Sequence, residues 1–386
     1  MRLLFTTAPL GGQFFPMVPL AWAARVAGHD VLVATTERFA PVVLRSGLPV
    51  VSWGDPPGFV DLVADQPAAS QDTVLARRRA HGRAFGRIAA DCLPGARSVV
   101  AAWKPDVVIS ERAEFAGPLA AAALDVPRVS FHWGVAPLAE YAPEVAAQLG
   151  GDDVLAGLPE PMETLNPWPR RMRLPYAAGH RGIRAVAYNG DARVPDWLLG
   201  EPPRRRICVT FGTLLPRMAA LGLRDVVAPL LARLALLDAE LCVAADDDVL
   251  AQWPELAEHA VHIGRLPMAQ LLRTCDLVVN HGGQGTVLTA LEAGCPQLVL
   301  PHIDDQFDNA DAVVRAGAGL SLALDEITPE RVTSRCRTLL EDDPGGGRSA
   351  SSAGRTFTAA AGRVSDEIAG QLSPVEIVDL LGKLVG

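Results

Sequence analysis

Short, continuously apolar segments alternate along this chain with stretches of helical periodicity, and this alternation constrains the fold more than any other sequence feature. A helix-period stretch at 17–26, for example, follows an apolar segment and stops at Gly28. Strands that are apolar along their whole length are typical of parallel sheets with helices on both faces. In the first half of the chain the predicted strands are 2–7, 30–34, 48–51, 105–110 and 126–131.

The alternation is interrupted once and then restarts. Between about 139 and 184 prolines are frequent and helical fragments are short, and 188–203 is predicted to be an extended connection. Further strands are predicted at 207–211, 240–245, 261–264, 277–280 and 297–300. We therefore expect an α/β protein of two Rossmann-like domains, with parallel sheets that face each other across a cleft. The expected units are a first domain at 1–190, a linker at 191–203, a second domain at 204–365 and a C-terminal helix at 366–386.

Composition and charge exclude several classes of partner. Of the 386 residues 49% are apolar and 20% are charged, which is enough apolar material for two cores. The net charge of −9 gives no attraction to nucleic acid or to anionic membrane surfaces. The first apolar run is too short for a signal peptide, and no run reaches the ~20 residues of a membrane span, so we expect a cytoplasmic protein. The six cysteines stand singly, which argues against a structural metal site.

The segment 280–291 carries the clearest chemical signal. A predicted strand ends at Asn280, and Gly282, Gly283 and Gly285 allow the backbone to approach a ligand before a helix starts near Thr286. Free N–H groups at a helix amino end, together with the helix dipole, suit a diphosphate, and His281 can donate a further hydrogen bond. No Walker lysine is present, which disfavours a nucleotide triphosphatase. The alternative is that the glycines only make a tight turn.

A second polar segment follows the strand that ends near Leu300. Asp305 and Gln306 are expected to face the cleft, where a carboxylate beside an amide would match paired sugar hydroxyls. Asp and Asn are also favoured at helix N-caps, so a purely structural N-cap region is the alternative.

These two segments, with 211–213 and 264–267, resemble the donor domain of the family 1 glycosyltransferases of GT-B fold. The resemblance is closest to the bacterial enzymes that attach deoxysugars to antibiotics and other polyketides, and 12–16, 104–109 and 188–190 also have counterparts. It implies a transferase whose co-substrate is a dTDP- or UDP-sugar, with no other cofactor and no metal. It also suggests that the C-terminal helix crosses back to the first domain. A homodimer stays open.

The resemblance also implies donor-side roles. His281 and the backbone of the glycine-rich loop would hold the diphosphate, with Thr213 near the same phosphates. The backbone around Arg265 and Leu266 would pair with the pyrimidine, and Asp305 and Gln306 would hold the sugar. Thr289 stands where many relatives that use uridine donors have a glutamate that binds the ribose hydroxyls. Deoxyribose has one hydroxyl fewer, so a dTDP donor is favoured. The donor-binding set is Thr213, Arg265, Leu266, His281, Gly282, Gly283, Gly285, Thr286, Asp305 and Gln306.

The base that takes the acceptor's proton is not evident. An inverting transfer needs such a base, and the family has a histidine where this chain has Gln13, whose amide does not accept a proton near neutral pH. Three interpretations stay open. Another group serves, with Glu111, Glu114 and His132 as candidates because each follows a strand end. Alternatively the acceptor ionises easily and Gln13 only orients it. In the third, the protein is a catalytically weakened relative that binds a nucleotide sugar or an enzyme partner.

The acceptor is expected to be large and apolar, such as a polyketide. Its pocket is predicted from Gly12, Phe14, Phe15, Trp133 and the segment 59–75, while Arg77, Arg78 and Arg79 are predicted to form an exposed helix face. The rival functions are a nucleotide-sugar epimerase on the same fold and a non-enzymatic nucleotide-sugar binder. A dinucleotide oxidoreductase is disfavoured because the first loop lacks G-x-G-x-x-G.

Overall fold

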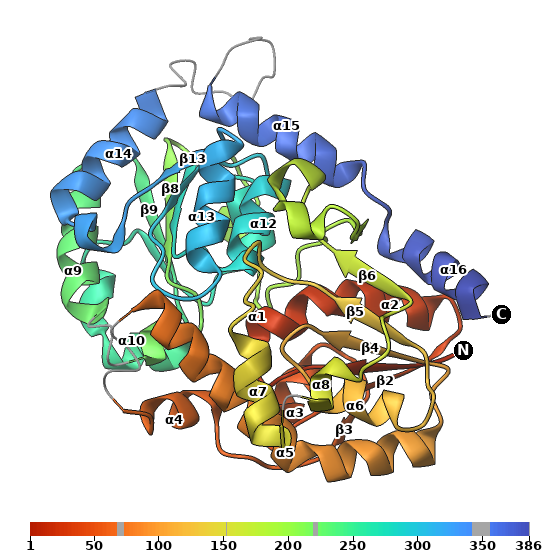
Figure 1. The fold of residues 1–386 in the computed structure, drawn as a ribbon. Helices are drawn as coiled ribbons and strands as arrows, with labels where there is room; N and C mark the ends of the chain where they lie inside the picture. Colours follow the sequence, from red (N-terminus) through yellow and green to blue (C-terminus); the bar gives the residue numbers. More distant parts are fainter. Residues whose placement is uncertain (68–72, 152, 219–222, 342–355, 386) are drawn as a thin grey trace.

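Each half of the chain is built on one parallel sheet (Figure 1). The computed structural model describes residues 1–67, 73–151, 153–218, 223–341 and 356–385. Within this part of the chain the first sheet has the spatial order β3 (Val50–Ser52), β2 (Asp30–Thr35), β1 (Arg2–Thr6), β4 (Val107–Glu111), β5 (Arg128–Phe131), β6 (Glu163–Asn166) and β7 (Arg181–Gly182). The second has the order β10 (His262–Gly264), β9 (Glu240–Ala244), β8 (Arg206–Thr210), β11 (Leu277–Asn280), β12 (Gln297–Val299) and β13 (Gly319–Ser321). Neighbouring strands are parallel in both sheets, as predicted.

Helices connect the strands and cover both sheets. Those of the first half are α1 (Gly11–Phe14), α2 (Val18–Val26), α3 (Ala40–Arg45), α4 (Phe59–Ala64), α5 (Val74–Trp103), α6 (Ala116–Ala122), α7 (Tyr141–Leu149) and α8 (Asp153–Ala156). Those of the second half are α9 (Leu223–Leu234), α10 (Asp247–Gln252), α11 (Met268–Leu272), α12 (Gln284–Glu292), α13 (Gln306–Arg315), α14 (Pro329–Glu341), α15 (Phe357–Ala369) and α16 (Pro374–Val385).

Each sheet has an apolar core on both of its faces. Leu3 and Phe5 of β1 pack in one core with α2, whereas Leu4 packs in the opposite core with α5, because successive side chains of a strand point to opposite faces. In the second sheet Val209 of β8 packs with α9 and α14, and its neighbour Cys208 packs with α11. Burial on both faces is the reason that the central strands are continuously apolar in the sequence.

Three short strands were not predicted. β7 and β13 lie at sheet edges, and β6 lies between β5 and β7. These strands have only two to four residues each, and they include polar residues such as Glu163, Asn166 and Ser321. Such short strands take their conformation from pairing with a neighbour, β5 for β6 and β12 for β13, so the local pattern does not mark them. The region 139–184 therefore completes the first sheet.

The C-terminal helices return from the second sheet to the first. α15 packs against α12 of the second half, whereas α16 packs against α2, near the amino terminus of the chain (Figure 1). Ile377, Val378 and Leu381 of α16 are buried in the same core as Leu3 and Phe5. The last helix thus contributes apolar surface to the first domain.

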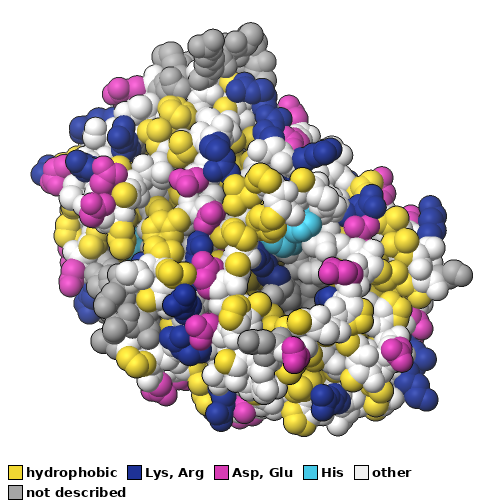
Figure 2. Space-filling view, in the orientation of Figure 1, with side chains coloured by type: hydrophobic (Ala, Val, Ile, Leu, Met, Phe, Trp, Pro, Cys, Tyr) yellow, Lys and Arg dark blue, Asp and Glu magenta, His cyan; other side chains and the backbone are white. Residues whose placement is uncertain are grey.

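The surface has no dominant charge. On the face drawn in Figure 2, basic and acidic side chains are interspersed among hydrophobic ones, and no broad basic area suited to a phosphate backbone is visible. Of the helices that the structure describes, none combines the length and the hydropathy that crossing a bilayer requires.

Replacement of Ile377 by alanine should weaken the first domain. Ile377 is fully buried, and large-to-small core substitutions of this type lower the free energy of unfolding by about 2–5 kcal/mol. Val375→Ala, in the same helix but 55% exposed, should change stability by less than ~0.5 kcal/mol. Urea unfolding followed by tryptophan fluorescence would measure both variants. Equal midpoints for the two would mean that α16 is not docked on the first domain in solution.

Candidate functional site

The loop between β11 and α12 carries the glycine-rich motif. Asn280 holds this loop, since its Oδ1 accepts a hydrogen bond from the Gly282 N–H at 2.8 Å. Gly282 has a φ of 87°, which favours glycine. Gly283 is the N-cap of α12 and makes no side-chain bond to the first amides of the helix. The amino end of α12 therefore keeps N–H groups for an anionic ligand. The first turn includes Gly285 and Thr286, both of which are partly exposed.

The His281 imidazole lies between two glycines. A Cβ atom at Gly283 would be 2.3 Å from His281 Nε2, and a Cβ atom at Gly212 would be 2.6 Å from Cε1. Both positions need glycine for the ring to stay where it is. Burial lowers the pKa of His281 to about 3, and His302 contributes in the same direction. The ring is therefore neutral near pH 7, with one N–H to donate and one nitrogen to accept.

Asp305 lies at the start of α13 and faces the first domain. Its Oδ2 accepts a hydrogen bond from Asn309 Nδ2 at 2.7 Å and does not cap the helix. A Cβ atom on Gly134 of the first domain would be 2.6 Å from the same oxygen. Burial, together with the charge of Asp304, raises the pKa of Asp305 to about 7. Around neutral pH this carboxyl group is thus available both as acceptor and as donor.

Gln306 is placed differently from the sequence prediction. Its Oε1 accepts hydrogen bonds from the backbone N–H groups of His302 and Ile303 at 2.9 and 3.1 Å. The amide oxygen therefore closes the turn after β12 and does not face the cleft, which leaves only Nε2 for a ligand.

Two residues of these segments join the domains, and sequence reasoning missed this role. Gln284 Oε1 accepts from the Gly134 N–H at 2.6 Å and from Trp168 Nε1 at 2.7 Å. Asn309 Oδ1 accepts from the Val135 N–H at 2.8 Å. Both residues belong to the two motifs, but their partners lie more than a hundred residues away, so nothing local in the sequence marks the contacts.

Arg77 and Arg78 are not on an exposed helix face as predicted. Arg77 is buried, and Arg78 Nη2 donates at 2.8 Å both to the Asp304 carbonyl oxygen and to Asp308 Oδ2. The side chain of Arg78 is only 13% exposed because the two domains meet over α5. These arginines thus belong to the domain interface.

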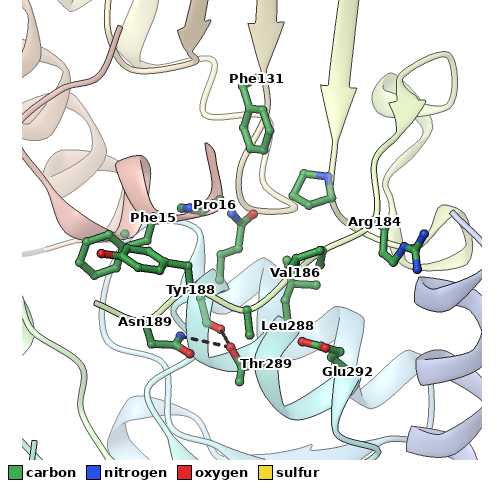
Figure 3. Close-up of a pocket in the computed structure, with 16 residues that line it drawn as sticks. Phe15, Pro16, Phe131, Arg184, Val186, Tyr188, Asn189, Leu288, Thr289 and Glu292 are labelled. Atoms are coloured by element: carbon green, nitrogen blue, oxygen red, sulfur yellow. Dashed lines mark hydrogen bonds between the residues drawn. The ribbon is translucent and has the colours of Figure 1, made fainter. Parts of the chain in front are cut away.

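A pocket lies between the first-domain loop, the connection between the sheets and α12 (Figure 3). It encloses about 540 Å³ of unfilled space, part of it open to solvent. Gly12 and Phe15 line it as predicted, and Tyr188 packs edge-on against Phe15. Asn189 and Thr289 point toward each other across the pocket, with Asn189 Nδ2 donating to Thr289 Oγ1 at 3.2 Å (Figure 3). Asn189 Oδ1 is buried and makes no hydrogen bond to the described residues.

Phe14 and Trp133 do not line this pocket. Phe14 is buried in the core of the first domain against Phe39. Successive residues of a helical turn point about 100° apart around the axis, so Phe14 and Phe15 face different surroundings. Trp133 is buried in the opposite core, where its Nε1 donates to Glu111 Oε2 at 2.6 Å. Within the segment 59–75, Phe59 and Val63 are core residues, and 68–72 lie outside the described part of the chain.

Glu111 and Glu114, the two glutamates predicted as candidate bases, are held by hydrogen bonds within the first domain. Glu111 accepts hydrogen bonds from the backbone N–H groups of Ala8 and Ala113, in addition to the tryptophan. Glu114 accepts from Thr6 Oγ1 at 2.6 Å and from two amides at the start of α6. Burial raises the pKa of both, to about 7 for Glu114. Because every carboxylate oxygen is engaged within the domain, this geometry argues against either as the base.

Gln13 and His132 are also buried. Gln13 lies in α1, and its Oε1 has no hydrogen-bond partner among the described residues. His132 Nε2 lies 3.2 Å from the Tyr176 hydroxyl. Burial lowers the pKa of His132 well below its usual value, and Arg112 acts in the same direction. A ring with so little affinity for a proton is a poor general base.

Three residues predicted to contact the nucleotide follow the carboxyl ends of strands in the second sheet. They are Thr213, Arg265 and Leu266. Thr213 is exposed, directly after the turn at Gly212. Arg265 is exposed and donates to Asp191 at 3.0 Å, and Leu266 packs partly on the core beside α11. This group surrounds the ends of β8 and β10, on the same edge of the sheet as the glycine-rich loop.

Comparison with known proteins agrees with this geometry. Two family models match, the N-terminal domain of erythromycin biosynthesis protein CIII-like proteins over residues 22–212 and the C-terminal domain over 228–384. An L-demethylnoviosyl transferase of Streptomyces niveus is 40% identical over 360 residues, which cover 89% of this chain and 91% of the relative.

Solved structures agree over the whole chain. The spinosyn rhamnosyltransferase SpnG complexed with thymidine diphosphate is 29% identical, with a TM-score of 0.81 and coverage of 99% of this chain and 100% of that one. The glycosyltransferase SsfS6 of Streptomyces sp. SF2575, also complexed with thymidine diphosphate, is 30% identical, with a TM-score of 0.77 and 99% coverage of both chains. With two facing α/β domains and both family models matched, this chain belongs to the EryCIII-like family of GT-B glycosyltransferases.

Proposed function

We propose that this glycosyltransferase transfers a deoxysugar from a dTDP-sugar to an apolar natural-product acceptor, with inversion at the anomeric carbon. The observation that carries the proposal is the amino end of α12, where a glycine N-cap leaves amide N–H groups unpaired and neutral His281 adds a donor. A leaving diphosphate gains negative charge as its bond to the sugar breaks. Donors that are already oriented toward this charge stabilise it without reorganisation.

The nucleoside side of the pocket favours thymidine. Thr289 is a short side chain whose hydroxyl donates to the Gly285 carbonyl at 2.6 Å and accepts from Asn189. A deoxyribose has no 2′-hydroxyl, so no carboxylate is needed at this position to accept a hydrogen bond from it. The buried Asn189 Oδ1 is suited to accept from the remaining 3′-hydroxyl. The thymidine diphosphate bound to SpnG and SsfS6 supports this choice.

The sugar lies, in this proposal, between the diphosphate and Asp305. Asp305 packs directly against the Gly134 backbone, so both domains border the position proposed for the sugar. The acceptor approaches from the first domain and attacks the anomeric carbon opposite to the leaving diphosphate, in a single displacement that inverts the configuration. Apolar side chains such as Phe15 and Phe131 form the wall on that side. This wall suits acceptors such as the 3-alpha-mycarosylerythronolide B and the tylactone named for two relatives.

A donor and acceptor screen tests the function. The purified chain would be incubated with dTDP- and UDP-sugars and with aromatic and macrolide acceptors, and released nucleotide and product configuration would be measured by chromatography and NMR. We expect dTDP release that depends on the acceptor. Epimerised donor in the absence of an acceptor would favour the epimerase. Calorimetric binding of donor without turnover on any acceptor would favour the non-enzymatic binder.

The glycine beside His281 should be required for diphosphate binding. In Gly283→Ala the new Cβ would be 2.3 Å from Nε2, so the ring must move and its hydrogen bond to the phosphate should be lost. A bond to a charged group contributes about 1.5–3 kcal/mol, so the Kd for dTDP should rise at least tenfold in calorimetry. Gly362→Ala in α15, where nothing lies within 4 Å of the new atom, is the matched control. An unchanged Kd for the first variant would exclude His281 from the phosphate site.

Thr289→Glu should shift the donor preference toward UDP-sugars. The new carboxylate would accept from the 2′-hydroxyl of ribose, which deoxyribose lacks. We expect the ratio of kcat/KM for UDP-sugar to that for dTDP-sugar to rise about tenfold, equivalent to about 1.4 kcal/mol. Thr289→Ser retains the hydroxyl that Asn189 contacts and should keep the original ratio. If the glutamate variant also keeps it, this position does not select the nucleotide.

A further inference from the structure

A buried histidine from the first domain pairs with the sugar-binding loop of the second. His81 lies in α5, and its Nδ1 is hydrogen-bonded to Asp304 Oδ2, which directly precedes the proposed sugar contact Asp305. The His81 side chain is 0% exposed, and its Nε2 has no hydrogen-bond partner among the described residues. A buried polar nitrogen without a partner is unfavourable, so its presence needs an explanation.

The backbone of Asp304 is held in an unusual conformation to make this pair. Its φ of 47° lies in the left-handed region, which non-glycine residues adopt rarely. Arg78, three residues before His81 and on the same side of α5, donates to the Asp304 carbonyl oxygen and to Asp308. Two neighbouring side chains of α5 thus hold the loop from the first domain. Strained backbone of this kind concentrates at functional sites.

The pair offers the proton-accepting chemistry that the other candidate groups lack. Gln13 stands where the family resemblance implies a histidine base, and Glu111 and Glu114 have their oxygens engaged within the domain core. His81 packs edge-on against Phe59, at 5.2 Å between ring centroids, in the domain where the acceptor is proposed to bind. A carboxylate on Nδ1 holds the imidazole in the tautomer whose Nε2 carries the free lone pair.

We propose that His81, oriented by Asp304, is the general base of the transfer; this rests on the proposed function. Nε2 takes the proton of the acceptor hydroxyl while the acceptor oxygen forms its bond to the anomeric carbon. The bond from that carbon to the diphosphate oxygen breaks, and its electron pair leaves with the diphosphate. Asp304 stabilises the imidazolium, which returns its proton to water after product release.

The pair also couples proton transfer to domain closure. Since His81 and Asp304 come from different domains, opening of the cleft separates them and exposes Nε2 to an incoming acceptor. Closure re-forms the pair around the acceptor and excludes water, which limits hydrolysis of the donor. The complete burial of the ring belongs to this closed state.

His81→Asn tests the base with little change in packing. The asparagine amide can still donate to Asp304 from the position of Nδ1, but it has no nitrogen that accepts a proton. With aliphatic alcohols or weakly acidic phenols as acceptors, kcat should fall 10²–10⁴-fold. The loss should shrink steadily along a phenol series of decreasing pKa, since an acceptor that is already ionised needs no base. The Kd for dTDP should be unchanged. His29→Asn is the matched control, because His29 is partly exposed and precedes the amino end of β2, at the edge of the sheet opposite to the strand ends that face the cleft.

Several outcomes would overturn the proposal. Full activity of His81→Asn on alcohols would do so, and so would an equal loss for every acceptor, which indicates a structural role. Asp304→Asn is the second variant if the first does not fold, and it should show a smaller loss with the same dependence on acceptor acidity. If the wild-type chain transfers sugar and both variants behave like it, only the base assignment fails. If the wild-type chain transfers to no acceptor, the proposed function fails and the base fails with it.

Discussion

The first N–H groups of α12 have no side-chain cap, and the geometry of the proposed donor site depends on these uncapped N–H groups. A serine or aspartate at the N-cap would satisfy these amides from within the protein, whereas Gly283 leaves them for an external anion. The same glycine, together with Gly212, makes room for the His281 ring. Burial then keeps this ring neutral, so it adds a donor without adding a positive charge that would hold the product diphosphate more tightly.

The residues proposed to bind the donor belong to the second domain, but groups of the first domain hold the loops that carry them. Gln284 and Asn309, which follow the ends of β11 and β12, both accept hydrogen bonds from the backbone at Gly134 and Val135. Arg78 and His81 of α5 hold the loop at Asp304 from another direction. The loop at Asp304 and Asp305, which we propose to bind the sugar, is therefore held by both domains at once. Contact between the domains at this loop would also exclude water that competes with the acceptor in the proposed transfer.

Some of the expectations from sequence were correct for reasons that can be stated. The central strands were predicted because two-sided burial leaves a continuous apolar run. The loop between β11 and α12 was predicted from its glycines, and the structure shows Gly282 at a positive φ and Gly283 against the His281 ring. Glu111 and Glu114 were assigned to chemistry because they follow a strand end. Their carboxylates instead accept bonds from nearby backbone amides and from Trp133 or Thr6, which strand position alone does not reveal. Phe14 and Phe15 are adjacent, yet one faces the core and the other the pocket.

By itself, the sequence determined the two-domain α/β class, the position of the glycine-rich loop before α12 and the membership in a glycosyltransferase family, because periodicity and spaced glycines are local properties. The tertiary structure alone decided which polar groups are free. The side-chain oxygen of Gln306 accepts a hydrogen bond within a turn, and the carboxylates of Glu111 and Glu114 accept from nearby backbone amides. His81 is hydrogen-bonded to Asp304, which lies 223 positions away along the chain. Hydrogen-bond capacity is consumed by whichever partner folding brings near, and that partner is set by the packing of both domains, which no local pattern records.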